Sequence, residues 1–447
     1  MNVKMNFTGK NKLNDEEFIK FYDRLWEELP HKVLKNEPTQ SEIQKRKKEF
    51  SDFYNNPSPY SIDGEIWDYY PCNRRYLVSS EGRIKYNFGD KLYQLIEQDD
   101  YSKNKPGYLV LKQVNLSQKV YNFVAITFLG KIEGDGYEVH HINNNGYDCS
   151  TKNLILLTQI QHEIVHLEKH LSKAELINYL KEREQEEAIK KHLSRYKLNY
   201  LKIEDSGSWN NTMRPHILPE NEKIKNLIMC SYEKEFKSLF EKEKEFFHPY
   251  FAHLNSSQAL CFNLFYPLVI KNCLSLIHSS ISKDAKAFFE YVEDDSFEKA
   301  SNRKEKTNFD FFINDKGNKY FFEIKYTERQ FEPEDADSKH DKKYKAYYME
   351  QVRKIANEEI TEEEFFKSYQ IWRNVCHSDT GKVFFVLPKT RVSLIESVNC
   401  VIKKCKNEYQ KSINILFIED LVQIFLKIED SKFQKHFQEF FGKYLSF

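Results

Sequence analysis

The 447-residue chain contains little glycine and little proline, only 13 and 12 residues. Both are well below the usual shares of about 7% and 5%. This scarcity excludes a low-complexity or largely disordered chain, because such chains are rich in these residues. Neither charge is in excess, since 68 Lys and Arg balance 68 Asp and Glu. A globally basic, histone-like binder is therefore excluded, although a local basic patch can still bind nucleic acid.

Long apolar runs are also absent. No stretch approaches the roughly 20 apolar residues that span a bilayer, and the N-terminus has no apolar signal segment. None of the eight cysteines forms a CxxC pair, so a zinc site with cysteine ligands is not expected. We therefore expect a cytoplasmic protein with reduced thiols and no membrane partner. The 35 Phe and 28 Tyr, together with the length, predict two or three well-packed domains.

The order of the predicted elements divides the chain into four segments. Residues 1–60 form a helical N-terminal segment, because apolar residues recur at helical spacing over 12–54 and Asn14 is the expected N-cap. Short β-rich runs broken by glycine follow in residues 61–170. Residues 171–219 form a charged helical linker that ends in a Gly- and Pro-containing loop, at 204–220, where we place the main domain boundary. The linker helix is interpreted as solvated, with a helix lying along nucleic acid as the alternative.

The second half of the chain alternates helices with strands. The run FDFFINDKGNKYFFEIKY, residues 309–326, predicts a hairpin that turns at DKGN. A strand over 382–388 and a strand followed by a helix near 413–427 complete an α/β core in residues 220–447. We expect a multidomain chain of the α+β or α/β class.

Four histidines and one asparagine lie close together in VHHINNNGYDCSTKNLILLTQIQHEIVH. His162 and His166 are four residues apart, so on a helix both rings lie on one face, as two ligands of one metal must. His140 and His141 are adjacent on a predicted strand, so their side chains diverge, and one can bind the ion while the other acts as a base. Asn153 is expected to tie loop backbone together through its amide.

This segment resembles the HNH (ββα-metal, His-Me finger) endonucleases. The resemblance implies that His140, His162 and His166 bind a divalent ion, namely Mg²⁺, Mn²⁺, Ni²⁺ or Zn²⁺. It also implies that His141 activates water and that Asn153 orients His141. Two other interpretations stay open, a degenerate DNA-binding HNH fold and an unrelated set of histidines.

The preceding segment EIWDYYPCNRRYLVSSEGRIKY, residues 65–86, resembles the short module found before many phage and intron HNH nucleases. Four basic residues in it are candidates for phosphate contacts on a duplex, with ordinary solvated surface as the alternative. These residues are Arg74, Arg75, Arg83 and Lys85.

A second group of charged residues lies in the predicted hairpin. Glu323 and Lys325 project from one face of a strand, and Asp310 on the partner strand can join them. Two carboxylates can hold Mg²⁺ against a phosphate, and a lysine beside them can position the attacking water. Charges in such apolar strands need a reason, since their burial is costly. An amphipathic hairpin with surface charges is the alternative.

The arrangement resembles the PD-(D/E)XK nucleases, with Asp310, Glu323 and Lys325 matching D…E-x-K. The resemblance, which spans about 220–425, implies a restriction-endonuclease-like fold with Mg²⁺ on Asp310 and Glu323. An upstream glutamate often completes such sites, and Glu290 and Glu293 are both candidates. Gln258, Gln370 and Arg373 are candidates for lining the DNA path, with polar packing as the alternative.

Together these features predict an N-terminal HNH nuclease joined to a C-terminal PD-(D/E)XK domain. The predicted activity is metal-dependent hydrolysis of double-stranded DNA in bacterial restriction or anti-phage defence, and RNA is not excluded as a substrate. One alternative is a homing-type HNH nuclease whose C-terminal domain only recognises DNA, and another is an inert nucleic-acid-binding protein. Self-association and a modification or inhibitor partner are compatible with these families.

Overall fold

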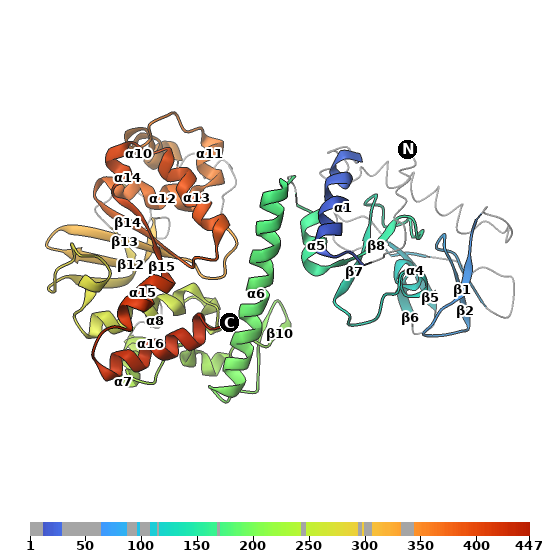
Figure 1. Cartoon of the computed structure of the whole chain (residues 1–447), viewed down its shortest axis with the longest axis horizontal. Coiled ribbons are helices and arrows are strands. Elements are labelled where there is room, and N and C mark those ends of the chain that lie inside the picture. Colours follow the sequence, from blue (N-terminus) through green and yellow to red (C-terminus); the bar gives the residue numbers. More distant parts are fainter. Residues whose placement is uncertain are drawn as a thin grey trace. The chain divides into compact units, whose positions relative to one another are not determined.

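The computed structural model describes residues 12–28, 64–86, 96–98, 108–113, 116–167, 170–242, 247–293, 297–298, 306–331 and 344–447. The chain forms two compact units, Met1–Leu180 and Lys181–Phe447 (Figure 1). Both units mix helices with sheets, which agrees with the predicted fold class.

The first unit begins with helix α1, Asp15–Glu28, at the cap that the sequence predicts. The Asn14 side chain accepts a hydrogen bond from the Glu17 backbone N–H at 2.9 Å, and the Glu17 carboxylate accepts one from the Asn14 N–H at 3.0 Å. Phe18, Phe21 and Leu25 then lie on the buried face, as their spacing requires. The remainder of the expected helix, residues 29–54, lies outside the described part of the chain.

Short strands follow in this unit, in line with the β-rich texture. An antiparallel sheet is formed by β1 (Trp67–Tyr69), β2 (Tyr76–Ser79) and β3 (Ile84–Tyr86), and a second by β4 (Ile96–Gln98), β5 (Tyr108–Gln113) and β6 (Leu116–Lys119). Helix α4 (Val120–Phe128) leads to the antiparallel pair β7 (Tyr137–His141) and β8 (Leu154–Thr158), which is followed directly by α5 (Gln159–Val165). The Thr158 side chain and Gln161 form a capping box that begins α5.

Helix α6, Lys173–Asn199, is not the solvated linker that its charged sequence suggests. Leu176 and Leu180 are buried in the core of the first unit, whereas Ile189 and Leu193 are buried in the core of the second. The two units therefore divide within this helix, rather than at residues 204–220. That stretch packs on the second core instead, where Ile217 is buried.

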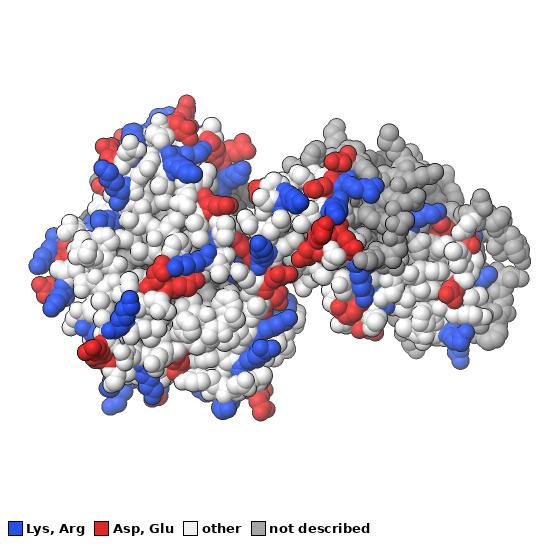
Figure 2. Space-filling model, in the orientation of Figure 1, with Lys and Arg blue, Asp and Glu red and all other residues white. Residues whose placement is uncertain are grey.

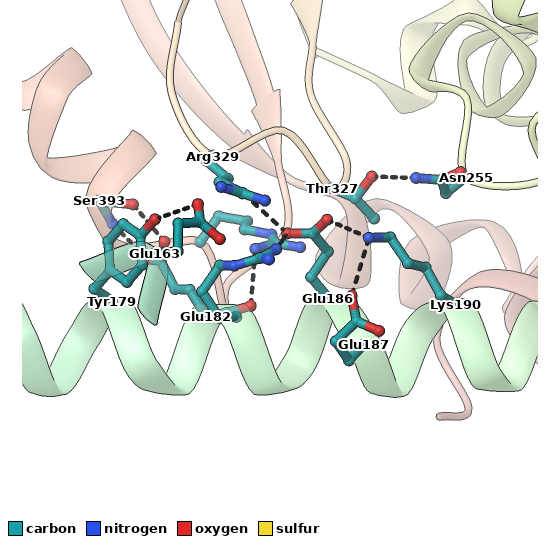
Figure 3. A network of polar contacts seen from close by, with 12 residues as sticks. Glu163, Tyr179, Glu182, Glu186, Glu187, Lys190, Asn255, Thr327, Arg329 and Ser393 are labelled. Atoms are coloured by element: carbon teal, nitrogen blue, oxygen red, sulfur yellow. Dashed lines mark hydrogen bonds and ion pairs between the residues drawn. The ribbon is translucent and has the colours of Figure 1, made fainter. Parts of the chain in front are cut away.

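The charged residues of α6 also form buried contacts (Figure 3). Glu182 accepts hydrogen bonds from the Ser393 backbone N–H and hydroxyl, and the fully buried Arg391 donates to the Glu182 carbonyl oxygen. Glu186 lies among Arg183, Lys190 and Arg329, and these cations hold the pKa of the Glu186 carboxyl at about 2, against the effect of its burial. A high density of charge in a helix thus indicates polar packing here, which composition alone cannot distinguish from solvation.

The second unit is built around a five-stranded sheet with the strand order β11-β12-β13-β14-β15. The strands are β11 (Lys286–Val292), β12 (Asn308–Asp315), β13 (Asn318–Ile324), β14 (Gly381–Leu387) and β15 (Ile413–Phe417). The first three are antiparallel neighbours, and β13, β14 and β15 run parallel. The central strands β12, β13 and β14 each contain a buried apolar run because both faces of the sheet are covered there.

The hairpin predicted around DKGN is confirmed. β12 and β13 are joined by the two residues Lys316 and Gly317, which have φ angles of +54° and +96°. Two left-handed residues produce the tight turn whose twist matches the paired strands. Gly317 is needed there because residues with a Cβ rarely adopt so positive a φ.

Helices cover both faces of this sheet (Figure 1). One core contains Phe311, Phe322 and Phe384 together with residues of α8 (Ser257–Ile270), α15 (Ile418–Phe425) and α16 (Ser431–Tyr444). The opposite core contains Phe321 and Phe385 with residues of α10 (Met349–Ile355), α11 (Glu362–Lys367), α12 (Tyr369–Val375) and α13 (Val392–Lys403). The remaining elements are the hairpin β9 (Gly207–Trp209) and β10 (Thr212–Arg214), the helices α7 (Glu233–Lys242) and α14 (Asn407–Gln410), the 3₁₀ turns η1 (Glu220–Asn226), η3 (Pro249–Ala252), η4 (Leu274–Leu276) and η7 (Cys376–Asp379), and the π-helical turn η6 (Tyr344–Tyr348).

The surface carries both charges in mixture. On the face shown in Figure 2, Lys and Arg alternate with Asp and Glu over each unit, as the formal neutrality predicts. No helix in the described ranges is both long enough and apolar enough to cross a membrane. All eight cysteines are free thiols, and two of them, Cys72 and Cys400, are exposed rather than in a core.

The last helix, α16, buries a lysine without a carboxylate partner within ion-pair distance among the described residues. Lys443 is fully buried, and its ammonium donates to the Asn226 carbonyl at 2.6 Å and to the Asn226 side-chain oxygen at 2.7 Å. Burial disfavours the charged form, which lowers the pKa of the Lys443 ammonium to about 7.

This burial predicts a pH-dependent stability. An unfolded lysine keeps its proton up to about pH 10.4, so between pH 7 and 10 the unfolded state binds more protons than the folded state. The free energy of unfolding is therefore expected to rise over this range, and Lys443→Met is expected to remove that part of the rise. Urea unfolding of both proteins at several pH values measures it. Equal slopes against pH would contradict the prediction.

Two phenylalanines of α16 provide a matched test of the core. Phe437 is completely buried, whereas Phe441 on the same helix is 39% exposed. Phe437→Ala is expected to lower the free energy of unfolding of the second unit by about 3–5 kcal/mol. Phe441→Ala should change it by less than about 0.5 kcal/mol. Chemical denaturation of the full chain compares them, and similar losses would show that the assigned packing is wrong.

Candidate functional site

Three of the four predicted histidines come together in the first unit. His140 lies near the end of β7, His162 lies in α5, and His166 directly follows α5. One ligand atom of each lies within 4.8 Å of the others, and theirs is the one such trio of His, Cys, Asp or Glu among the described residues. The strand pair and the short helix therefore converge three imidazoles on a single point, as the spacing of the sequence predicts.

The electrostatics of the trio suit a set of metal ligands. His140 is buried, and its Nε2 atom has no hydrogen-bond partner in the described structure. Burial and the neighbouring histidines hold the pKa of His140 well below its usual value and lower the pKa of His166 to about 4. Neutral imidazoles are the form that binds metal, and an unpaired buried nitrogen is costly without a ligand. The residues therefore fit a divalent transition ion.

Glu138 completes this arrangement, and sequence reasoning missed it. Its carboxylate lies 2.6 Å from His162 Nδ1, while His162 Nε2 lies 3.3 Å from His166 Nε2. A carboxylate on the outer nitrogen fixes the tautomer and leaves Nε2 free for an ion. The signal in the sequence was the alternation of β7, which places Glu138 and His140 on the same side of the strand.

His141 points away from the trio, as expected for neighbours on a strand. Its ring is perpendicular to the ring of Tyr121, with centroids 5.2 Å apart, and its Nε2 has no hydrogen-bond partner among the described residues. Burial, with smaller contributions from His162 and Lys119, lowers the pKa of His141 to about 3. An imidazole with a free nitrogen can accept a proton.

Asn153 holds the loop between the two strands. Its side-chain oxygen accepts a hydrogen bond from the Asn143 backbone N–H at 2.9 Å, and its amide donates to the Asp148 carbonyl at 2.8 Å. The Asn143 N–H lies two residues beyond His141, so the contact stabilises the end of β7. Asn153 therefore ties the segment that follows His141 to the far side of the loop.

A basic residue precedes α4, although the helix itself carries none. Lys119 ends β6, and its ammonium lies 4.4 Å from the ring centroid of Tyr108 and 5.6 Å from that of Tyr121. Both rings also contact His141.

The basic residues of the upstream module divide into two kinds. Arg74 and Arg75 are exposed, as a phosphate contact requires. Arg83 is 3% exposed and forms a two-point ion pair with Glu65, so the prediction that it contacts phosphate is not supported. Lys85 is half-buried, and its ammonium lies 4.4 Å from the centroid of the Trp67 ring.

The second predicted cluster lies where β12 and β13 end their pairing. Asp310 accepts a hydrogen bond from the Ile324 backbone N–H at 2.7 Å, and Lys325 Nζ lies 3.3 Å from a Glu323 oxygen. The other Glu323 oxygen accepts a hydrogen bond from the Asn374 amide at 3.2 Å. Glu323 and Lys325 are both buried, so the alternative of surface charges on an amphipathic hairpin is wrong.

The two candidate upstream glutamates have different surroundings. Glu290 accepts hydrogen bonds at 2.6 Å from the Gln258 and Asn308 amides, and its charge acts on Asp310. Glu293 instead pairs with Lys319 and lies 3.5 Å from His377 Nδ1. Of the two, Glu290 is therefore brought to the Asp310 group.

The backbone is distorted at Glu290. It has a φ of +49°, which is rare for a residue with a side chain, in the middle of strand β11. The β11–β12 ladder pairs Phe289 with Phe311 and Tyr291 with Phe309, and it skips the Glu290–Asp310 position between them. Such local strain is characteristic of functional sites.

The buried carboxylates of this cluster repel one another. Burial and the charges of Glu323 and Glu290 raise the pKa of Asp310 well above its usual value, and burial raises the pKa of Glu290. Although burial opposes it, the neighbouring carboxylates raise the pKa of Lys325, so this residue remains an ammonium. A group of buried carboxylates with one lysine binds a proton or a cation to relieve the repulsion, which suits a hard divalent ion such as Mg²⁺.

The three predicted DNA-lining residues are placed differently. Gln258 is buried and joins Glu290 to the backbone N–H of His248, which accounts for both ends of its amide. Arg373 donates to the Tyr348 hydroxyl at 3.1 Å and lies over the Tyr369 ring, so it packs inside the unit rather than along a DNA path. Gln370 is half-buried on α12.

Comparison with known families agrees with this division of the chain. A family model described as HNH endonuclease matches residues 121–164, which include β7, β8 and His162. A second model, described as Restriction Endonuclease associating with ARP, matches residues 190–445. The second match covers more than half of the chain, so the protein belongs to the family of restriction endonucleases associating with ARP. No curated protein and no solved structure matches the chain. The predicted fusion of an HNH region with a restriction-endonuclease-like region is confirmed.

The histidine trio predicts stoichiometric metal binding. The wild-type chain is expected to bind Co²⁺ or Zn²⁺ there, and His140→Ala should abolish this binding. Glu138→Gln should weaken it by about 10- to 100-fold, because His162 loses the carboxylate that orients it. Isothermal titration against chelated metal measures the affinities. Glu133→Gln, an exposed neighbour of the same charge, is the control, and undiminished binding by His140→Ala would refute the site.

Proposed function

We propose that this protein is a metal-dependent DNA endonuclease with two active sites, one in each unit. The observation that carries the proposal is the convergence of His140, His162 and His166 beside the separate base candidate His141. The ββα arrangement of β7, β8 and α5 around this trio supports a ββα-metal HNH centre. The D…E-x-K cluster on a mixed five-stranded sheet supports a PD-(D/E)XK centre.

In the first centre, His140, His162 and His166 would hold the ion, with Glu138 orienting His162. A bound divalent ion supplies charge neutralisation at the scissile phosphate and at the leaving oxygen. His141 takes the proton from the attacking water, and Asn153 keeps the strand end that carries His141 in position. Lys119, beside the same two tyrosines as His141, supplies a positive charge for a neighbouring phosphate.

In the second centre, Asp310 and Glu323 would hold Mg²⁺, with Glu290 completing the acidic group. The bound ion supplies the same neutralisation of phosphate charge. Lys325 is the cation that orients the attacking water and stabilises the developing charge. Asn374 holds one Glu323 oxygen, which leaves the other facing Lys325.

The favoured substrate is double-stranded DNA, and the favoured setting is restriction or anti-phage defence in a bacterial cytoplasm. The family of restriction endonucleases supports this context. The mixed surface charge supports modest non-specific affinity that weakens with salt. RNA remains a second substrate class for the same chemistry.

A homing-type nuclease is the second candidate, in which the C-terminal unit only recognises DNA. The match of the HNH model favours it, whereas the buried D…E-x-K cluster favours a second active site. If Lys325→Ala abolishes cleavage at one strand and spares binding, recognition alone does not describe the C-terminal unit. An inert nucleic-acid-binding protein would bind no stoichiometric metal at either centre.

Two active centres predict a division of strand cleavage. Wild type should linearise supercoiled plasmid with Mg²⁺ or Mn²⁺, while His141→Ala and Lys325→Ala should each only nick it. The double variant should be inactive, since each group is worth about 10²- to 10⁴-fold in its own reaction. Agarose electrophoresis over time separates supercoiled, nicked and linear forms.

The matched controls are His170→Ala and Lys286→Ala, which change exposed residues outside the two clusters. Both should cleave like wild type. If one single variant is already inactive and the other is unaffected, then only one unit is a nuclease. In that outcome the two-centre proposal fails.

A further inference from the structure

An aromatic pocket lies in the second unit, outside both clusters described above. Its cavity volume is about 500 Å³, and it is lined by the hairpin β9–β10 and by η3. The residues that give it its character are Trp209, Met213, Tyr250, His253, Ser208 and Glu220. This size falls in the range of small-molecule sites, about 300–1,000 Å³.

Exposed aromatic rings form the walls of this pocket. Trp209 is 37% exposed and Tyr250 is 42% exposed. Their rings meet at 83°, with centroids 4.5 Å apart, and the His253 ring lies 5.5 Å from each. The two rings make a corner that can stack on one face of a planar ligand and meet its edge.

The hairpin is held rigidly against the floor of the pocket. Asn210 and Asn211 have φ angles of +48° and +59°, the conformation of a tight two-residue turn. At Gly207, an added Cβ would lie 2.4 Å from the Leu218 carbonyl oxygen, so only glycine permits this approach. The pocket is therefore preformed, which lowers the entropy lost when a ligand binds.

The segment that contains η3 is tied at two points to the acidic cluster of Glu290, Asp310 and Glu323. The His248 backbone N–H donates to Gln258 at 2.9 Å, and Gln258 in turn donates to Glu290 at 2.6 Å. The Asn255 amide donates to Thr327 at 2.7 Å, two residues beyond Lys325, as Figure 3 shows. Tyr250 and His253 lie between these anchors, so the pocket and the acidic cluster are parts of one framework.

We propose that this pocket binds a single unpaired nucleobase of the DNA substrate. Rings stack on every base, and the Ser208 hydroxyl and the His253 imidazole among the lining residues are hydrogen-bonding groups for the base edge. Arg214 on β10 is exposed, with no ion pair inside the described ranges, and it offers a positive charge to the adjoining phosphate. The inference rests on the proposed function, since it assumes that nucleic acid lies at Asp310 and Glu323.

The test measures base preference without cleavage. Fluorescein-labelled duplexes carry one central unpaired adenine or an abasic site in its place, and binding is followed by anisotropy in EDTA. Wild type is expected to bind the adenine duplex about tenfold more tightly. Trp209→Ala and Tyr250→Ala should lose this preference, whereas Trp209→Phe, which keeps a ring, should retain most of it.

The control is Phe441→Ala, which removes an exposed aromatic ring elsewhere in the same unit and should keep the full preference. Equal binding of the two duplexes by wild type, or an unchanged preference in Trp209→Ala, would overturn the inference. Plasmid cleavage is measured separately. If the chain cleaves plasmid but shows no base preference, the nuclease proposal stands and the inference that the pocket binds a base fails. A Trp209-dependent preference in a chain whose cleavage is insensitive to His141→Ala and Lys325→Ala keeps the pocket inference and removes only the assignment of the two catalytic centres.

Discussion

Burial of ionisable side chains is the constraint on which this structure depends. A charge that leaves water must be matched by a partner, a proton or an ion. On α6 two buried carboxylates are matched, since Glu182 and Glu186 have hydrogen-bond or ion-pair partners within the unit. In the histidine cluster and in the acidic cluster the matching of buried groups is incomplete. His140 Nε2 and His141 Nε2 have no partner among the described residues, and Asp310 lies beside two other acidic groups.

Strand β11 is distorted beside the acidic cluster. An undisturbed β11–β12 ladder would pair Glu290 with Asp310 through the backbone, but the left-handed conformation of Glu290 interrupts it. Toward the neighbouring strand β13, the Asp310 carboxylate accepts a hydrogen bond from the Ile324 N–H. The fold thus loses regular backbone pairing at the position where two of the acidic residues lie opposite each other on β11 and β12.

The sequence predicted the features that are set by short-range chemistry. The DKGN turn, the Asn14 cap and the i, i+4 spacing of His162 and His166 each depend on residues close together in the chain. Features that depend on distant partners were missed or left open. The ion pair between Arg83 and Glu65 and the position of Glu290, rather than Glu293, beside Asp310 arise only after folding. The partly buried α6 was misjudged because composition cannot distinguish charges paired inside a protein from charges in water.

The two clusters also differ in the ions that their donor atoms favour. Three imidazoles suit Zn²⁺, Ni²⁺ or other transition ions, whereas carboxylate oxygens suit Mg²⁺ or Mn²⁺. Each donor set follows from its setting. The neutral histidines tolerate burial with no counter-charge, but the acidic cluster needs a cation or a proton to offset its repulsion. One chain that carries both donor sets would therefore bind different ions at its two centres. Metal bound at one centre would then not show whether the other centre is filled.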